Sequence, residues 1–204
     1  MSKMSMMGAQ MGRRAVLAGL AGGAVAMTLP GRALAYSVDL ARSLIDKVVR
    51  DINKIIASGK SEALMIRDFE KIFVNYADVG RIALLVLGPD GRSASASQKR
   101  AFTKAFQGYI GRKYGRRFRE FIGGRIEVQD AKAVKSFYEV RTTTHLAGQA
   151  PFEVVFVVAD QNGRFIDLKI EGISLVKSER SEVGAMLDKR RGDLNELIAY
   201  LKTI

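Results

Sequence analysis

The chain has 204 residues, a length typical of one domain, and its 48 % apolar content is enough to build a sizeable core. It has no cysteine and one histidine, His145, which excludes disulfide frameworks, thiolate metal sites, cysteine nucleophiles and metal sites made of several histidines. The formal net charge of +12 favours partners with acidic surfaces, such as nucleic acid, anionic lipid headgroups or an acidic protein face.

The first 35 residues have the layout of a cleaved export signal. They contain four basic residues and no acidic one, and residues 15–29 form an uncharged run rich in Gly and Ala. This run is shorter than the roughly 20 residues that span a bilayer, and Ala33-Leu34-Ala35 supplies small residues for cleavage. The pair Arg13-Arg14 favours the twin-arginine export route, although an ordinary Sec signal with two adjacent arginines has the same sequence pattern. We expect a domain over residues 36–204 in an envelope compartment, with 29 basic and 21 acidic residues.

Apolar residues at helical spacing predict four helices in the first half of that domain. They cover residues 38–58, about 61–76, 79–87 and about 95–122, with a turn at 88–91. Asp78 is placed to cap the third helix. The fourth helix carries an aromatic stripe, and Gly108, Gly111 and Gly115 on its other side admit a close neighbour or let the helix bend.

From residue 125 onward the apolar period changes to two, which predicts strands. Four strands are expected at about 125–129, 134–146, 151–158 and 166–170, followed by helices near 173–189 and 193–203. In the last strand Ile166, Leu168 and Ile170 share a face. Short turns such as Asn162-Gly163 indicate a meandering, mainly antiparallel sheet. Because the strands are segregated from the helices, the sequence predicts an α+β fold with helices packed on one face of the sheet.

Residues that carry catalytic chemistry are scarce. The phosphate-binding, nucleophile-elbow, zinc-protease and dinucleotide-binding motifs do not occur. His145 would need an orienting carboxylate to act as a general base, and a partly exposed strand histidine is the plainer interpretation. Asp167 and Glu171 would share a strand face about 13 Å apart at ~3.3 Å per residue, beyond the ~5–9.5 Å of paired glycosidase carboxylates. We therefore predict no catalytic group, no metal site and no cofactor.

A basic cluster follows the aromatic stripe at the end of the long predicted helix. Its members are Arg112, Lys113, Arg116, Arg117, Arg119 and Arg125, and the predicted docking residues among them are Arg112, Arg116, Arg117 and Arg119. They form either a solvated face or a docking face for anionic headgroups or a protein partner. Nucleic acid is disfavoured, because an exported protein rarely meets it and the interleaved aromatic residues lie on an apolar helical stripe.

The apolar residues leave open whether the core is filled or hollow. An apolar sheet face, an aromatic helix stripe and a nearly wholly apolar third helix enclose a dry cavity if the helices do not close fully on the sheet. Each CH₂ group of an acyl chain that enters such a cavity contributes about 0.8 kcal/mol. A plain, filled core fits the same pattern.

Three stretches match the pattern of a known family. They are Asp78 through Leu87-Gly88; Gln98, Phe102 and Phe106 followed by Tyr114; and residues 167–176 followed by Arg180-Ser181. On these residues the chain, from Phe73 onward, resembles the MlaC or toluene-tolerance auxiliary family, the periplasmic phospholipid-binding component of the Mla lipid-transport system. It departs from the family in having no tryptophan, and in having Glu179 and Val183 where the family has Tyr and Phe.

The resemblance implies a soluble phospholipid carrier and not an enzyme. Family members hold the lipid tails between sheet and helices. They shuttle a diacyl phospholipid between an outer-membrane lipoprotein–porin complex and the MCE-domain protein of an inner-membrane ABC transporter. We expect bound phospholipid as the cargo, and a monomer. The period of two and a helical wheel then predict the lining residues Leu84, Phe106, Tyr109, Phe118, Val140, Phe156, Val158, Leu168 and Ile170.

Two alternatives stay open. One is an exported enzyme with a cone-shaped α+β fold and a polar pocket near His145. The other is a structural adaptor without a ligand.

Overall fold

The structure is a computed structural model that describes residues 37–204, and of residues 118 and 119 only the backbone. The export signal predicted over residues 1–35 lies outside the described residues and stays a prediction. The described part forms one compact unit.

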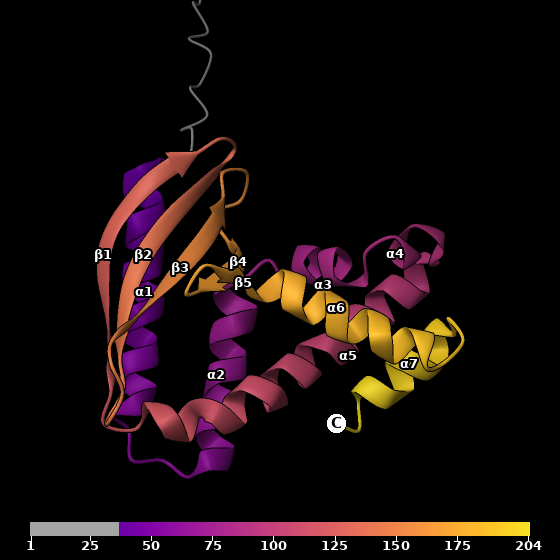
Figure 1. Ribbon diagram of the computed structural model, residues 1–204, viewed down its shortest axis with the longest axis horizontal. Helices are drawn as coiled ribbons and strands as arrows, with labels where there is room; N and C mark the ends of the chain where they lie inside the picture. Colours follow the sequence, from indigo (N-terminus) through magenta and orange to yellow (C-terminus); the bar gives the residue numbers. More distant parts are fainter. Residues whose placement is uncertain (1–36) are drawn as a thin grey trace, which may run out of the picture. The chain divides into compact units, whose positions relative to one another are not determined.

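The described part begins with helices, continues through a sheet and ends with helices, which confirms the predicted α+β class (Figure 1). The elements are α1 (Val38–Ile56), α2 (Glu62–Tyr76), α3 (Val79–Leu87), α4 (Asp90–Ser93), α5 (Ala96–Gly115), the 3₁₀ helix η1 (Arg116–Phe121), β1 (Arg125–Val134), β2 (Phe137–His145), β3 (Phe152–Ala159), β4 (Phe165–Ile170), β5 (Ile173–Ser174), α6 (Leu175–Asp188) and α7 (Leu194–Leu201).

Polar side chains cap the helices where the sequence changes from loop to apolar period. The Asp78 carboxylate accepts a hydrogen bond from the Arg81 amide at 3.0 Å, as its position predicted. Ser95 and Gln98 form a reciprocal capping box at the start of α5. These caps satisfy amides that have no partner inside the helix, and so they fix where α3 and α5 begin.

The sheet is antiparallel with strand order β1-β2-β3-β4-β5, one short strand more than predicted. Val140, Phe156 and Leu168 lie opposite one another across β2, β3 and β4, which confirms their shared face. The prediction for Ile166 is wrong, because a register shift between Val157 and Val158 puts Phe165 opposite Val158. Such an irregularity changes which side chains face inward. Ile166 therefore packs in a separate cluster with Val157 and Ala159.

Two predicted boundaries also differ. The strand predicted from residue 134 begins at Phe137, because Val134 ends β1 and Lys135, with φ 55°, turns the chain. The helix predicted to reach residue 122 ends at Gly115, and the chain tightens into η1. The turn predicted at 88–91 is confined to residues 88 and 89, because the short helix α4 already begins at Asp90.

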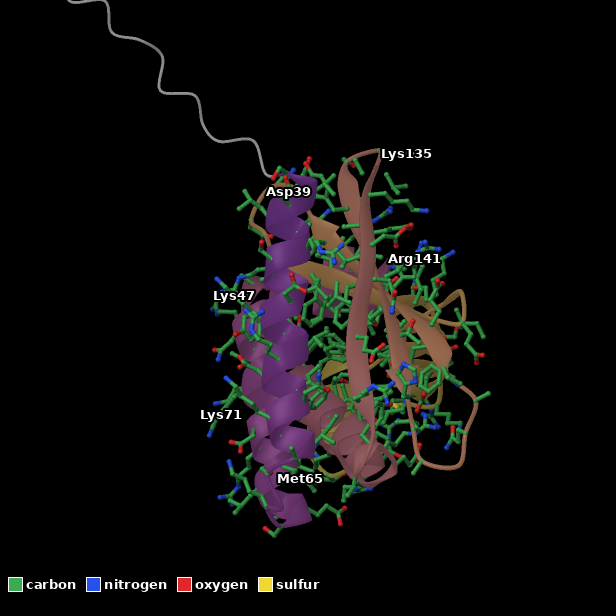
Figure 2. All side chains as sticks on the ribbon, turned by 90° about the vertical axis from the view of Figure 1, so that its left-hand side faces the viewer. Asp39, Lys47, Met65, Lys71, Lys135 and Arg141 are labelled. Carbon is green, nitrogen blue, oxygen red and sulfur yellow. The ribbon has the colours of Figure 1, made fainter. Side chains whose placement is uncertain are left out.

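The helices cover the inner face of the sheet. Figure 1 shows α1 running along β1 and β2, while α3 and α6 lie side by side next to β4 and β5. In Figure 2, Lys47 and Lys71 extend from the side of α1 and α2 that is turned away from β1. The opposite face of the sheet carries ion pairs, such as Arg141–Asp130 at 2.5 Å and Lys169–Glu139 at 2.6 Å. One main core therefore lies between sheet and helices.

The glycine side of α5 packs against α2, which supplies the predicted close neighbour. A Cβ atom built on Gly111 would lie 3.4 Å from Cγ of Glu70, in ordinary contact. A Cβ atom on Gly115 would lie 2.7 Å from Cγ1 and 3.1 Å from Cβ of Ile66, which is too close. Gly115 therefore sets how near the two helices approach.

Gly115→Ala should lower the free energy of unfolding by about 1–3 kcal/mol, because α2 and α5 must separate to accept the methyl group. Gly184→Ala on α6 is the matched control, since no atom lies within 4 Å of a Cβ built there. It should raise the free energy of unfolding by roughly 0.5–1 kcal/mol through helix propensity. Urea unfolding followed by circular dichroism measures both. A Gly115→Ala protein as stable as the wild type would contradict the close approach.

Candidate functional site

An apolar pocket lies where α3, α5 and α6 meet β4. Its volume is about 30 Å³, and nine of its eleven lining residues are apolar. Its walls are Phe73, Ile82, Val86, Phe106, Ile110, Phe165, Asp167, Leu168, Leu175, Val176 and Glu179.

Aromatic contacts fix the wall on the sheet side. The ring of Phe165 lies 6.4 Å from that of Phe73 and 5.6 Å from that of Phe156, the second pair edge to face at 84°. Edge-to-face pairs place the positive ring edge on the negative face of the neighbour, and they hold the rings in one orientation. The register shift in β3–β4 thus delivers Phe165 to the pocket.

Asp167 ties β4 to the beginning of α6. Its Oδ1 accepts hydrogen bonds from the amides of Leu168 at 2.8 Å and Val176 at 3.0 Å, and its Oδ2 accepts one from Ser174 Oγ at 2.6 Å. The predicted shared strand face of Asp167 and Glu171 is wrong, because β4 ends at Ile170 and Glu171 turns the chain with φ 49°. Asp167 therefore positions a pocket wall.

A polar cluster links α5 to α6 beside the pocket. Glu179 Oε1 accepts hydrogen bonds from Lys113 Nζ at 2.7 Å and from the Tyr114 hydroxyl. Lys113 also donates to Glu182, whose other oxygen accepts from the Tyr109 hydroxyl at 2.9 Å. Four side chains surround Lys113: the carboxylates of Glu179 and Glu182, and two tyrosines whose hydroxyls each donate to one of these carboxylates. The cluster thus joins two helices through polar groups that range from the buried Glu179 to the exposed Glu182.

The protonation of this cluster follows from burial and hydrogen bonding. Burial, together with the nearby Glu179 carboxylate, raises the pKa of the hydroxyls of Tyr109 and Tyr114, so both stay protonated and donate. Burial alone would lower the pKa of Lys113, but its hydrogen bonds to Glu179 and Glu182 raise that pKa on balance. Lys113 therefore stays a cation between two carboxyl groups.

The structure brings only part of the predicted lining set to this pocket. Phe106 and Leu168 line it. Val140, Phe156 and Val158 are buried in the same core but do not line this pocket. Ile170, half-buried, pairs with Val154 and Ile173 near the end of β4.

Two predicted lining residues on the helices do not lie where the helical-wheel analysis placed them. Tyr109 is buried in the main core, with its hydroxyl in the polar cluster. Leu84 is 42 % exposed, because α3 turns Ile82 and Val86 toward the pocket instead. The side chain of Phe118 lies outside the described residues. Since α3 is nearly all apolar, its sequence pattern cannot select the inward face.

The predicted basic cluster separates into parts. Arg112 is occupied, because its guanidinium donates to the carbonyls of Ile204 and Leu201, both at 2.6 Å, and holds the end of α7. Arg116 and Arg117 are exposed on η1, where Arg117 lies 3.5 Å from Glu120. The side chain of Arg119 lies outside the described residues. Cations near the last carbonyls of a helix are stabilising, which explains the position of Arg112.

His145 lies at the end of β2, as predicted, with its Nε2 3.3 Å from Glu127 Oε2. Glu127 also accepts a hydrogen bond from Arg125 at 2.7 Å, and none of the three lines the apolar pocket. Within residues 37–204, no cluster of three or more His, Cys, Asp or Glu side chains is arranged to bind a metal ion. In the same range, no helix combines the length and apolar character that crossing a bilayer requires.

The fold is similar to that of a solved protein. A phospholipid-binding protein from Ralstonia solanacearum, whose structure was determined in complex with a phospholipid, superposes with a TM-score of 0.68. The two chains are 18 % identical, and the match covers 80 % of this chain and 95 % of that one. The described domain therefore has the fold of that protein.

The family is established by a second comparison. The family model described as MlaC protein matches residues 42–203. The chain belongs to the MlaC family. This confirms the resemblance recognised from Phe73 onward and extends it into the first predicted helix.

Proposed function

We propose that the protein is a periplasmic phospholipid carrier. It takes up a diacyl phospholipid as its cargo and passes it between an outer-membrane lipoprotein–porin complex and the MCE-domain protein of an inner-membrane ABC transporter. The observation that carries the proposal is a largely apolar pocket between sheet and helices in a member of the MlaC family. A carrier role needs burial of apolar chains and no reacting group, in agreement with the lining residues.

Lipid uptake requires the pocket to widen. A volume of about 30 Å³ holds one or two groups the size of a water molecule, not an acyl chain. The pocket walls belong to the same core as Val140, Phe156 and Val158. Acyl chains that part α3 and α6 would therefore extend toward these sheet residues, and each CH₂ group would contribute about 0.8 kcal/mol.

Export is part of the same proposal. The uncharged run behind Arg13-Arg14 is interpreted as a twin-arginine signal, with cleavage after Ala35. A carrier between two membranes has to reach the periplasm, so the signal and the proposed function support each other. We propose that it acts as a monomer.

Protein purified from its native host should release about one diacyl phospholipid per chain on solvent extraction, measured by mass spectrometry. Val176→Trp should reduce the recovered lipid at least about fivefold, because the larger side chain fills a pocket wall that is only half-buried at present. Thermal unfolding checks that the variant is folded.

Val74→Trp is the matched control. Val74 is an exposed residue of α2 that does not line the pocket, so the same substitution there should leave the lipid recovery unchanged. Wild-type protein that carries no lipid, and does not take up phospholipid from vesicles, would overturn the proposed function. Equal lipid recovery from folded Val176→Trp protein would move the binding site away from this pocket.

A further inference from the structure

Two exposed cations lie directly beside the pocket wall that α6 forms. Lys177 and Arg180 follow the wall residues Val176 and Glu179 in the chain. They are three positions apart, so they are neighbours on the surface of the helix, and both are exposed. Within residues 37–204 neither side chain forms an ion pair with a carboxylate. Their positive charge is therefore available to a ligand outside the pocket.

Cations near the other walls of the pocket are engaged within the fold. Lys113 on α5 pairs with two glutamates, Arg164 before β4 donates to two backbone carbonyls, and Arg81 on α3 lies over an aromatic ring. Lys177 and Arg180 differ from these three cations, because no group in the described part of the chain neutralises them or accepts their hydrogen bonds.

Arg180 lies across the boundary between the two helices that form opposite walls. α3 and α6 are side by side (Figure 1), and a Cβ atom built on Gly88, at the end of α3, would lie 2.9 Å from Nε and 3.0 Å from Cζ of Arg180. The guanidinium therefore rests against the backbone of α3. Leu84 and Leu85 of α3 are also exposed. The outer rim between α3 and α6 thus has cations on one helix and apolar side chains on the other.

This combination fits the part of a phospholipid where the acyl chains meet the phosphate. A phosphodiester is charged, so moving it into the apolar pocket is costly, and it stays at the surface. Acyl chains that part α3 and α6 leave the phosphate at the outer rim between these helices. There a guanidinium and an ammonium group can donate charge-assisted hydrogen bonds to its oxygens.

We infer that Lys177 and Arg180 hold the phosphodiester of the bound phospholipid outside the pocket, at the rim between α3 and α6. The inference rests on the proposed function and deepens it, because it assigns residues to the charged group of the cargo. A phosphodiester links the glycerol to the headgroup in both phosphatidylcholine and phosphatidylglycerol. The pair therefore adds affinity for both lipids, whatever lies beyond the phosphate.

The double variant Lys177→Gln with Arg180→Gln tests the inference on delipidated protein. Calorimetric titration with dioctanoyl phosphatidylcholine and with dioctanoyl phosphatidylglycerol should give dissociation constants about fivefold or more above those of the wild type, by a similar factor for both lipids. Dioctanoylglycerol has the same acyl chains and no phosphate, so it should bind the variant and the wild type equally.

Lys47→Gln with Arg50→Gln is the matched control. These two residues are also an exposed lysine and arginine three positions apart, they lie on α1, and neither lines the pocket. This variant should bind all three ligands like the wild type. Thermal unfolding checks that both double variants are folded.

Three results would overturn the inference and leave the proposed function intact. The first is phospholipid affinity that the substitutions at Lys177 and Arg180 leave unchanged. The second is an equal loss of dioctanoylglycerol affinity, which would place the effect in the pocket. The third is a loss confined to phosphatidylglycerol, which would show a response to the net charge of the lipid.

Inorganic phosphate alone should not bind the wild type at millimolar concentration. Binding of phosphate that the Lys177→Gln, Arg180→Gln variant loses would identify a site for the free anion and overturn the assignment to a lipid. Failure of the wild type to bind either phospholipid would overturn both the inference and the proposed function.

Discussion

Lys113→Met should lower the free energy of unfolding by about 3–5 kcal/mol, the usual result of removing one partner from a buried ion pair. The side chain of Glu179 is 3 % exposed, and Lys113 is the cation that pairs with it. Without Lys113, the carboxylate stays buried between α5 and α6 with only the Tyr114 hydroxyl as a donor. Urea unfolding monitored by circular dichroism measures the loss.

Two further variants separate the buried charge from other effects of the substitution. Lys113→Met combined with Glu179→Gln removes the charge and keeps an acceptor for Tyr114, so it should recover about 2 kcal/mol or more of the loss. Lys71→Met removes an exposed partner of Asp68, directed away from the sheet (Figure 2), and should cost at most about 1 kcal/mol. A Lys113→Met protein that loses no more stability than Lys71→Met would contradict a structural role for the buried pair.

The fold was largely predictable because its strongest determinants are local. Apolar residues alternate along these strands with a period of two, which puts Val140, Phe156 and Leu168 on the inner face in any register that keeps the apolar side inward. In the structure these three residues lie opposite one another on neighbouring strands. Ile166 was not predictable in the same way. The register shift beside Val157 depends on tertiary packing, which favours the larger ring of Phe165 on the inner face.

The site was less predictable because its features depend on contacts between distant segments. Phe106 and Leu168 followed from the helical and strand periods. The burial of Glu179 could not be predicted from the sequence. Its neighbours on α6 are polar, and its cationic partner, Lys113, lies 66 positions away in the chain. Arg112 likewise looks like a surface cation in the sequence, until the end of α7 provides two carbonyl acceptors.

The proposed function also requires a surface that docks on the partner complexes, and charge-reversal variants can test where that surface lies. The domain over residues 36–204 has 29 basic and 21 acidic residues. Of the predicted docking arginines with described side chains, Arg112 is engaged within the fold, so Arg116 and Arg117 on η1 are the exposed ones. Opposite charges on two proteins mainly accelerate their encounter, and they act less when salt screens them.

Reversing Arg116 and Arg117 together to Glu should slow lipid transfer to purified acceptor complexes about tenfold or more at low salt, with a smaller effect at physiological ionic strength, where the Debye length is about 8 Å. Transfer of a fluorescent phospholipid measures the rate, and mass spectrometry checks that bound lipid is retained, since neither arginine lines the pocket.

Lys47→Glu with Arg50→Glu gives the same change in net charge on the exposed side of α1 and should transfer lipid at nearly the wild-type rate. If both double variants slow transfer equally, the effect belongs to net charge and not to a docking surface on η1. If only the η1 variant loses its lipid at an unchanged transfer rate, those arginines hold the headgroup and not the partner.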